Sequence, residues 1–199
     1  DANHRPLFVY RHTIGTPLSD DVLVYEETDI GYYVGVGQTQ SQKFILIDAH
    51  DHQSSEVYLV DADAPASPLR LIEPRVHGHE YSVEHHGDRL IILTNSGGAE
   101  DFRIVEAPIA APAMSNWREL VPHKKGRLIL EHAVFAGHMS RLEREDGLPH
   151  ITITRLADGA EHAIAFDEEA YALGMSAGYE FDTTTLRFTY SSMTTPAET

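Results

Sequence analysis

Hydrophobic residues occur along the chain in short runs separated by polar turns, a pattern that predicts β-strands rather than helices. The clearest case is residues 43–61, where apolar runs at 44–47 and 57–60 flank the Asp, His, Gln and Ser residues of 49–55. This order predicts a strand, a polar turn and a second strand. A similar unit with a glycine-rich turn occupies residues 89–105 and begins about 46 residues later. A fixed spacing of this size is typical of repeat architectures.

Each repeat contains four short strands, and no long amphipathic pattern interrupts them. The expected strands are 4–10, 22–25, 31–35, 44–47, 57–60, 69–72, 81–83, 90–93, 102–105, 117–121, 127–134, 138–144, 151–156, 162–166, 171–175 and 186–190. One weak helical turn is expected at residues 167–171. A β-sandwich also has short strands at regular spacing, but four strands in every repeat favour the blades of a β-propeller. We therefore predict an all-β fold, a partial β-propeller.

The repeats divide the chain into about three complete four-stranded blades with a half blade at each end. The predicted divisions are 1–30 (the end of one blade), 31–75, 76–125 and 126–168 (complete blades) and 169–199 (the start of the next blade). We expect both ends to be cuts within a longer protein. Open blades expose strand edges and apolar faces, so we expect either self-association or pairing of the first two strands with the last two.

Composition narrows the function classes. The 199 residues are 42% hydrophobic, so the chain can bury a core, and its formal net charge is −16. A charge of this sign argues against a nucleic-acid partner and against electrostatic attachment to a membrane. No apolar run approaches the roughly 18 residues of a membrane span. Cysteine is absent, which excludes disulfides and thiol chemistry and fits a cytoplasmic location, with a periplasmic one left open.

Residues 174–178 (Gly-Met-Ser-Ala-Gly) match the G-x-S-x-G pattern of a serine nucleophile. That pattern needs a strand before the serine and a helix after it. Here the following residues, Tyr-Glu-Phe-Asp-Thr-Thr-Thr, favour a turn and a strand, and no histidine lies beyond His162. We therefore interpret Ser176 as the end of a blade strand and expect no catalytic residue in the chain.

Histidine is abundant, with 13 residues, and several lie close together in sequence. The densest groups are His50 with His52, His77 with His79, and His85 with His86. A His-x-His pair on a strand can face one metal ion, but further ligands at a recognisable spacing are missing. The acids at 48–51 and 61–63 lack the pattern of a calcium loop. We expect no metal site and no cofactor.

Six segments, in order along the chain, carry a resemblance to a known family. They are 10–16 (Tyr-Arg-His-Thr-Ile-Gly-Thr), 21–27 (Asp-Val-Leu-Val-Tyr-Glu-Glu), 55–57 (Ser-Glu-Val), 92–95 (Ile-Leu-Thr-Asn), 99–102 (Ala-Glu-Asp-Phe) and 190–196 (Tyr-Ser-Ser-Met-Thr-Thr-Pro). Together they resemble the oligopeptidase B branch, also called protease II, of the prolyl oligopeptidase family of serine peptidases. Each segment is a weak signal alone, and their joint order is fairly specific.

The resemblance implies a piece of an N-terminal seven-bladed propeller that caps an α/β-hydrolase domain. The catalytic triad would lie in that second domain, beyond Thr199. The propeller would admit short peptides, which the parent enzyme cleaves after Arg or Lys. Thr94 and Asn95 are candidates for substrate gating or for the domain interface. Ser96 stands where prolyl-specific relatives have a substrate-binding arginine, so that contact does not carry over.

Two hypotheses follow. In the first, the chain is a non-catalytic propeller fragment of an oligopeptidase B-like serine peptidase, and its partners are the hydrolase domain of the same polypeptide and short basic peptides. In the second, it is a free-standing propeller-like module that binds a protein or a ligand without peptidase activity. A fold alone cannot decide between them.

Overall fold

The structure, a computed structural model, describes residues 5–199. It contains sixteen short strands and three short 3₁₀ turns. The first eight strands are β1 (Phe8–Arg11), β2 (Val22–Glu26), β3 (Tyr33–Gln38), β4 (Phe44–His50), β5 (Ser55–Asp61), β6 (Arg70–Leu71), β7 (Tyr81–His86) and β8 (Arg89–Thr94). The others are β9 (Arg103–Pro108), β10 (Arg118–Val121), β11 (Arg127–Val134), β12 (His138–Glu145), β13 (Leu148–Arg155), β14 (Glu161–Ala163), β15 (Tyr171–Ser176) and β16 (Arg187–Ser192). The 3₁₀ turns are η1 (Leu18–Asp20), η2 (Ser96–Gly98) and η3 (Met114–Asn116).

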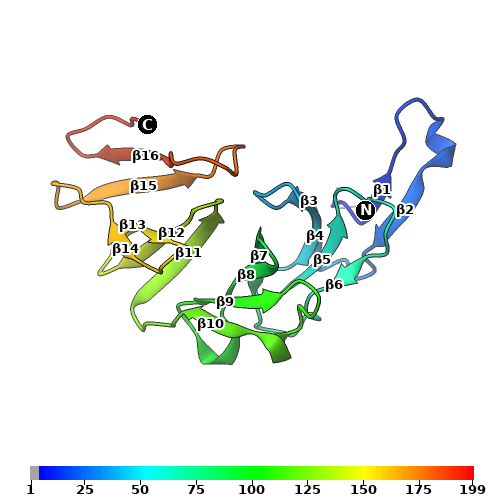
Figure 1. Cartoon of the computed structure of the whole chain (residues 1–199), viewed down its shortest axis with the longest axis horizontal. Coiled ribbons are helices and arrows are strands. Elements are labelled where there is room, and N and C mark those ends of the chain that lie inside the picture. Colours follow the sequence, from blue (N-terminus) through cyan, green and yellow to red (C-terminus); the bar gives the residue numbers. More distant parts are fainter. Residues whose placement is uncertain (1–4) are drawn as a thin grey trace.

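The strands form three four-stranded sheets, β3–β6, β7–β10 and β11–β14, flanked by the two-stranded sheets β1–β2 and β15–β16. Neighbouring strands within each sheet are antiparallel and follow one another in sequence. Figure 1 shows the sheets arranged side by side as an arc around an open centre, with the first strand of each complete blade on the inside. The predicted partial β-propeller, with three whole blades and two half blades, is confirmed.

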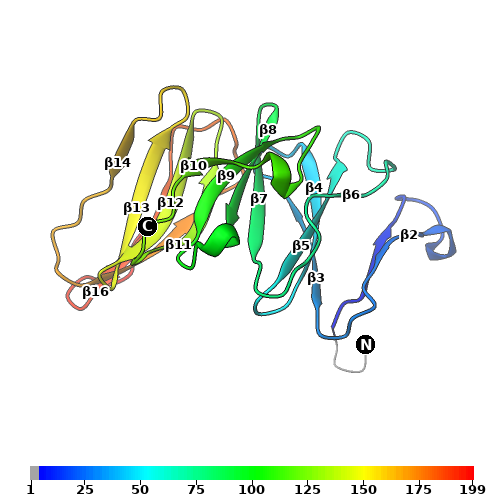
Figure 2. The ribbon, with the colours of Figure 1, turned by 90° about the horizontal axis from the view of Figure 1, so that it is seen from below.

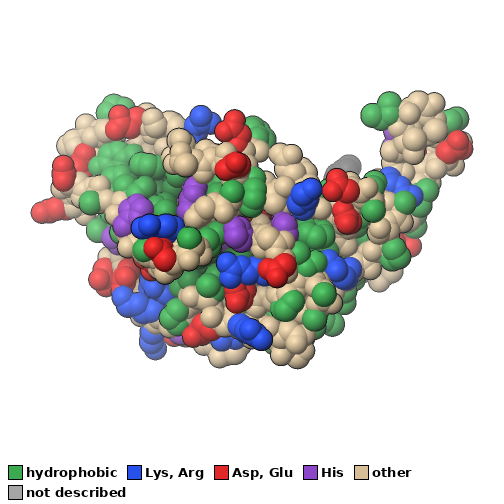
Figure 3. All heavy atoms as spheres, viewed as in Figure 1, with side chains coloured by type: hydrophobic (Ala, Val, Ile, Leu, Met, Phe, Trp, Pro, Cys, Tyr) green, Lys and Arg blue, Asp and Glu red, His purple; other side chains and the backbone are tan. Residues whose placement is uncertain are grey.

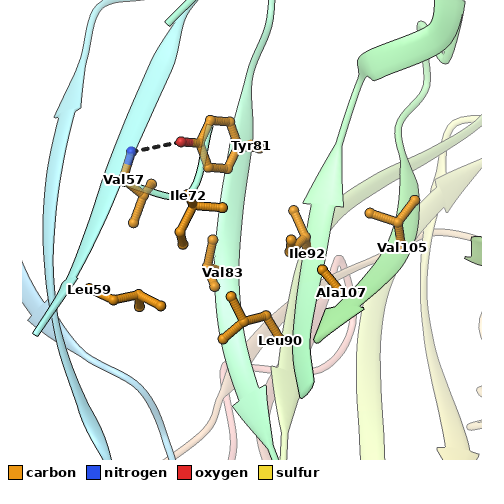
Figure 4. Packing of buried hydrophobic residues seen from close by; sticks show 9 residues of the cluster. All are labelled: Val57, Leu59, Ile72, Tyr81, Val83, Leu90, Ile92, Val105 and Ala107. Atoms are coloured by element: carbon orange, nitrogen blue, oxygen red, sulfur yellow. Dashed lines mark hydrogen bonds between the residues drawn. The ribbon is translucent and has the colours of Figure 1, made fainter. Parts of the chain in front are cut away.

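Apolar side chains between consecutive blades form the core. One cluster joins Val57 and Leu59 of the first whole blade to Tyr81, Val83 and other residues of the second. Figure 4 shows these side chains pointing toward one another between the two sheets, where the Tyr81 hydroxyl accepts a hydrogen bond from the backbone nitrogen of Val57, at 2.8 Å. Each blade therefore covers its neighbour, which explains why strands such as residues 44–47 are apolar on both faces.

The strand directions place the connecting loops at two ends of the arc. Because the strands of a blade alternate in direction, turns between first and second strands share one end. We call this the hairpin end; it carries the β3–β4, β7–β8, β11–β12 and β15–β16 connections. The connections between second and third strands lie at the opposite end. Figure 2 shows the loops above and below the nearly upright strands.

Three expectations are corrected by the structure. Residues 167–170 form a bend rather than a helical turn, because Phe166 stacks on Tyr190 with ring centroids 5.0 Å apart and β15 begins at Tyr171. The expected turn 49–55 is shorter, since β4 continues to His50 and β5 begins at Ser55. The half blades do not pair with each other: β1–β2 and β15–β16 are separate sheets at opposite ends of the arc. Self-association stays a prediction, which the molar mass from light scattering would test.

Candidate functional site

A loop at the hairpin end crosses the inside of the arc. It comprises residues 177–186 between β15 and β16, and we call it the crossing loop. The side-chain nitrogen of Gln40, in the β3–β4 turn, donates to three of its backbone carbonyl oxygens: Ala177 at 3.3 Å, Gly178 at 3.4 Å and Glu180 at 3.3 Å. The side-chain nitrogen of Gln42 donates to the carbonyl oxygen of Tyr179, at 3.2 Å. Figure 1 shows the two connections approaching each other across the open centre.

The crossing loop also contacts the blades that lie between. The backbone nitrogen of Ala136, in the β11–β12 turn, donates to the carbonyl oxygen of Phe181 at 2.9 Å. The carbonyl oxygen of Ala136 is in turn 3.0 Å from Nε2 of His86, at the end of β7. Residues from all three complete blades and the last half blade thus meet at the hairpin end. The arrangement links blades that are distant in sequence.

Glu84 of β7 supports the turn that holds the crossing loop. Its Oε2 accepts a hydrogen bond from the backbone nitrogen of Gln40, at 2.9 Å. Desolvation raises the pKa of Glu84 to about 7, although backbone hydrogen bonds from Gln40 and His85 act in the opposite direction. Next to it, Nδ1 of His85 lies 2.8 Å from the hydroxyl of Ser41. The carboxyl group of Glu84 therefore changes charge near neutral pH, at the point where the β3–β4 turn contacts β7.

We expect Glu84→Gln to make the fold less sensitive to alkaline pH. A raised carboxyl pKa means that the folded chain binds the proton more tightly than the unfolded chain. Its stabilising contribution is complete below the ordinary glutamate pKa and is lost as the pH rises through about 7. Between pH 5 and pH 8 the wild type should therefore lose about 1 to 2 kcal/mol of unfolding free energy that the variant keeps. This value is reduced to allow for the partial exposure of the Glu84 side chain.

Urea unfolding of both proteins at the two pH values measures this difference. Glu26→Gln is the matched control, because it removes the same charge from an exposed strand position. For the control, the difference in unfolding free energy from the wild type should be the same at both pH values. The same result for Glu84→Gln would contradict the role of Glu84.

The structure places the predicted residues Thr94 and Asn95 at the end opposite the crossing loop. Thr94 is fully buried, and its hydroxyl lies 3.0 Å from Nε2 of His79. Asn95 is half-buried; its Oδ1 accepts from the backbone nitrogen of Glu80 at 2.9 Å, and its Nδ2 donates to the carbonyl oxygen of Gly78 at 3.0 Å. Both side chains organise the β6–β7 and β8–β9 connections. A role in gating or at a domain interface stays a prediction, which the peptide kinetics of Asn95→Ala in the whole polypeptide would test.

The other motifs singled out in the sequence lie in structural positions. Ser176 ends β15 and is followed by a loop rather than a helix. Gly174 within the same motif allows a close approach to β16, because an added Cβ would lie 2.8 Å from Oγ1 of Thr189. Asp48 belongs to β4 and is not the turn acid that the sequence suggested. Within residues 5–199 no group of three or more His, Cys, Asp or Glu residues could hold a metal ion.

Sequence reasoning missed Gln40, Gln42 and Glu84. The two glutamines look like ordinary residues of a polar turn, and the partners of Gln40 lie 137 to 140 positions away. No local pattern carries that information. Glu84 could have been noticed as an acid on the innermost strand of a blade, between Val83 and His85.

Figure 3 shows acidic and basic side chains interspersed on the face viewed in Figure 1, rather than one basic patch. Across the described part of the chain, no helix is long and apolar enough to span a membrane.

Comparison with known proteins identifies the family. Residues 2–199 match the family model described as "Prolyl oligopeptidase, N-terminal beta-propeller domain". The chain is 38% identical to dipeptidyl aminopeptidase BI of Pseudoxanthomonas mexicana over 96% of its own length and 26% of that protein. It is 32% identical to protease 2 of Moraxella lacunata over 100% of its length and 28% of that protein. The chain thus spans about a quarter of the length of these relatives.

A solved structure supports the same assignment. Oligopeptidase B from Trypanosoma brucei, determined with covalently bound antipain, superimposes with a TM-score of 0.91 at 34% identity, over 99% of this chain and 29% of that one. The fold, the family model and the relatives agree with the resemblance read from the sequence. The chain belongs to the prolyl oligopeptidase family and is an oligopeptidase B-like part of its N-terminal β-propeller domain.

Proposed function

We propose that this chain is the non-catalytic part of a serine peptidase, in which it caps an α/β-hydrolase domain of the same polypeptide and restricts access to short peptides. The observation that carries the proposal is the crossing loop, which is held across the inside of the arc by Gln40 and Gln42. The similarity to dipeptidyl aminopeptidase BI, protease 2 and oligopeptidase B supports a peptidase as the parent.

The two ends of the arc would then have different tasks. The end that carries Thr94 and Asn95 faces the hydrolase domain, where a nucleophile, a base and an orienting acid perform acyl transfer. The hairpin end lies away from that domain, and the crossing loop narrows it. Folded proteins are excluded because their cross-section exceeds the opening, and short flexible peptides pass.

Cleavage after Arg or Lys fits the charge of the chain. A formal net charge of −16 attracts cationic peptides and raises their local concentration near the opening. This attraction weakens with salt, because exposed charges are screened over about 8 Å at physiological ionic strength.

Removing both glutamine contacts in the whole polypeptide tests the filter. We expect the variant Gln40→Ala/Gln42→Ala to cleave a long flexible basic peptide better, so that its kcat/KM relative to that of a tetrapeptide rises at least about threefold. Loss of the side-chain hydrogen bonds frees the crossing loop, while the hydrolase chemistry is untouched. The control Gln53→Ala changes an exposed turn at the opposite end. A ratio equal to that of the control would contradict the proposal.

The alternative is a free-standing binding module without peptidase activity, since one fold supports many functions. The gene sequence that continues after residue 199 discriminates between the two: an α/β-hydrolase domain with its own G-x-S-x-G motif favours the peptidase, and a stop codon favours the module. A cytoplasmic location is also proposed, on the absence of cysteine, and cell fractionation tests it.

A further inference from the structure

A cavity of about 330 Å³ lies between the first two complete blades. Strands β3, β4 and β5 form one wall, and β7 forms the other. Its size is within the range of small-ligand sites. The residues that matter for its chemistry are Gly37, Leu46, Asp48, His50, Val57 and Val83.

Two glycines of β3, the innermost strand of the first complete blade, leave room for the cavity because they have no side chain. Gly37 pairs with Leu46 across β3 and β4, and no atom lies within 4 Å of the position that a Cβ of Gly37 would take. Gly35 pairs with Asp48, and a Cβ there would lie only 2.5 Å from Oδ1 of Asp48. The first glycine keeps the cavity open, and the second lets the carboxylate lie close against the strand.

The polar side of the cavity is a carboxylate held in place. Nδ1 of His50 lies 2.8 Å from Oδ2 of Asp48 on the same face of β4, so the imidazole orients the carboxyl group. The Asp48 side chain is 37% exposed and accessible to a ligand. Among the described residues that line the cavity there is no Lys or Arg, and His50 is the basic side chain beside this carboxylate.

The other walls of the cavity are apolar. Leu46, Val57 and Val83 face the space from β4, β5 and β7. Tyr81 contributes its ring, because its hydroxyl is already used: it accepts from Val57 and donates to the carbonyl oxygen of Glu73, at 2.6 Å. The cavity thus combines one fixed negative charge with a hydrophobic slot.

We propose that this cavity binds a cation carried on an unbranched alkyl chain, namely a guanidinium or ammonium group that pairs with Asp48 while the alkyl chain lies against Leu46, Val57 and Val83. Charge-assisted hydrogen bonds to a carboxylate are stronger than neutral ones, and the apolar walls desolvate the methylene groups. An anion is disfavoured by Asp48. This inference goes beyond the proposed function, since it concerns binding by the propeller itself and needs no peptidase activity.

Titration of the 199-residue chain with n-butylguanidinium, followed by ¹H–¹⁵N NMR, tests the inference. We expect saturable shifts confined to the backbone amides of β3, β4, β5 and β7 around the cavity. The neutral isostere n-butylurea should bind at least about tenfold more weakly, because it lacks the charge that pairs with Asp48.

Three variants separate the cavity from the overall acidic charge. Asp48→Asn is expected to weaken binding about tenfold, since it removes the paired charge. Gly37→Val fills the cavity at an extended position of β3 and is expected to abolish the shifts. Asp20→Asn removes one exposed charge in the first half blade and should leave binding unchanged. The inference is overturned if butylguanidinium does not saturate, if the shifts lie elsewhere, or if Asp48→Asn and Asp20→Asn behave alike.

Discussion

Replacing Arg141 with methionine is expected to lower the free energy of unfolding by about 3 to 5 kcal/mol. The Arg141 side chain is 1% exposed, on β12 in the middle of the third complete blade. Its Nε lies 3.0 Å from a carboxylate oxygen of Glu143, and one terminal nitrogen lies 2.7 Å from Glu161 and 2.8 Å from the hydroxyl of Thr154. Methionine fills much of the volume but leaves the buried Glu143 without this cation, which is the costly part of the change.

Urea unfolding followed by fluorescence measures the effect on Arg141→Met. Arg155→Met is the matched control in the neighbouring strand, because its guanidinium is 65% exposed and its pair with Asp158 spans 3.5 Å. Exposed pairs contribute about 0 to 1 kcal/mol, so the control should change little. Equal losses in the two variants would show that the buried network of Arg141 does not stabilise the blade.

The second large effect is expected for Arg75→Met, which should release the first half blade from its neighbour. One terminal nitrogen of Arg75 lies 2.6 Å from Glu27, which follows β2, and 3.0 Å from Glu56 of β5. The guanidinium also lies over the ring of Tyr32, 4.0 Å from its centroid. Arg75 thus joins the segment that follows β2 to β5, and the sheets of these two strands share no strand pairing.

We expect a loss of about 2 to 4 kcal/mol for Arg75→Met, because two nearly buried carboxylates lose their common partner. Burial alone would raise the pKa values of Glu27 and Glu56, but hydrogen bonds from Arg75 contribute to lowering both below the ordinary range. Their stabilising contribution is therefore present above the usual glutamate pKa and is lost as the pH falls through the lowered values.

Amide hydrogen exchange distinguishes release of the half blade from general destabilisation. In Arg75→Met the amides of β1 and β2 should exchange faster than those of β11 to β14, whereas the exposed control Arg118→Met should leave the pattern unchanged. Faster amide exchange to the same extent in all sheets would contradict the prediction that Arg75 holds the first half blade locally.

The sequence was sufficient for the architecture because the architecture depends on short-range pattern. The apolar run at 44–47, the polar turn after it and the recurrence about 46 residues later require only strand and turn preferences. The boundary errors arose where tertiary contacts override those preferences. The residues around His50 favour a turn, but His50 belongs to β4. There its Nδ1 contacts the carboxylate of Asp48 on the same face of the strand.

The candidate sites were much less predictable, because they are made by residues from different blades. Gln40 contacts a loop near the far end of the chain, and Arg75 pairs with both Glu27, which follows β2, and Glu56 of β5. The cavity beside Asp48 depends on the absence of a side chain at Gly37, which reads in sequence only as a weak strand residue. Such features follow from the arrangement of blades rather than from any motif.

If the chain is a non-catalytic cap, it has no peptidase activity alone, and an activity assay with an arginine-amide chromogenic peptide measures this. The purified 199-residue chain is assayed beside the longer polypeptide that the proposed function requires. We predict no turnover by the chain alone and efficient cleavage by the longer polypeptide. Turnover by the isolated chain that persists through purification and disappears in Ser176→Ala would contradict the claim.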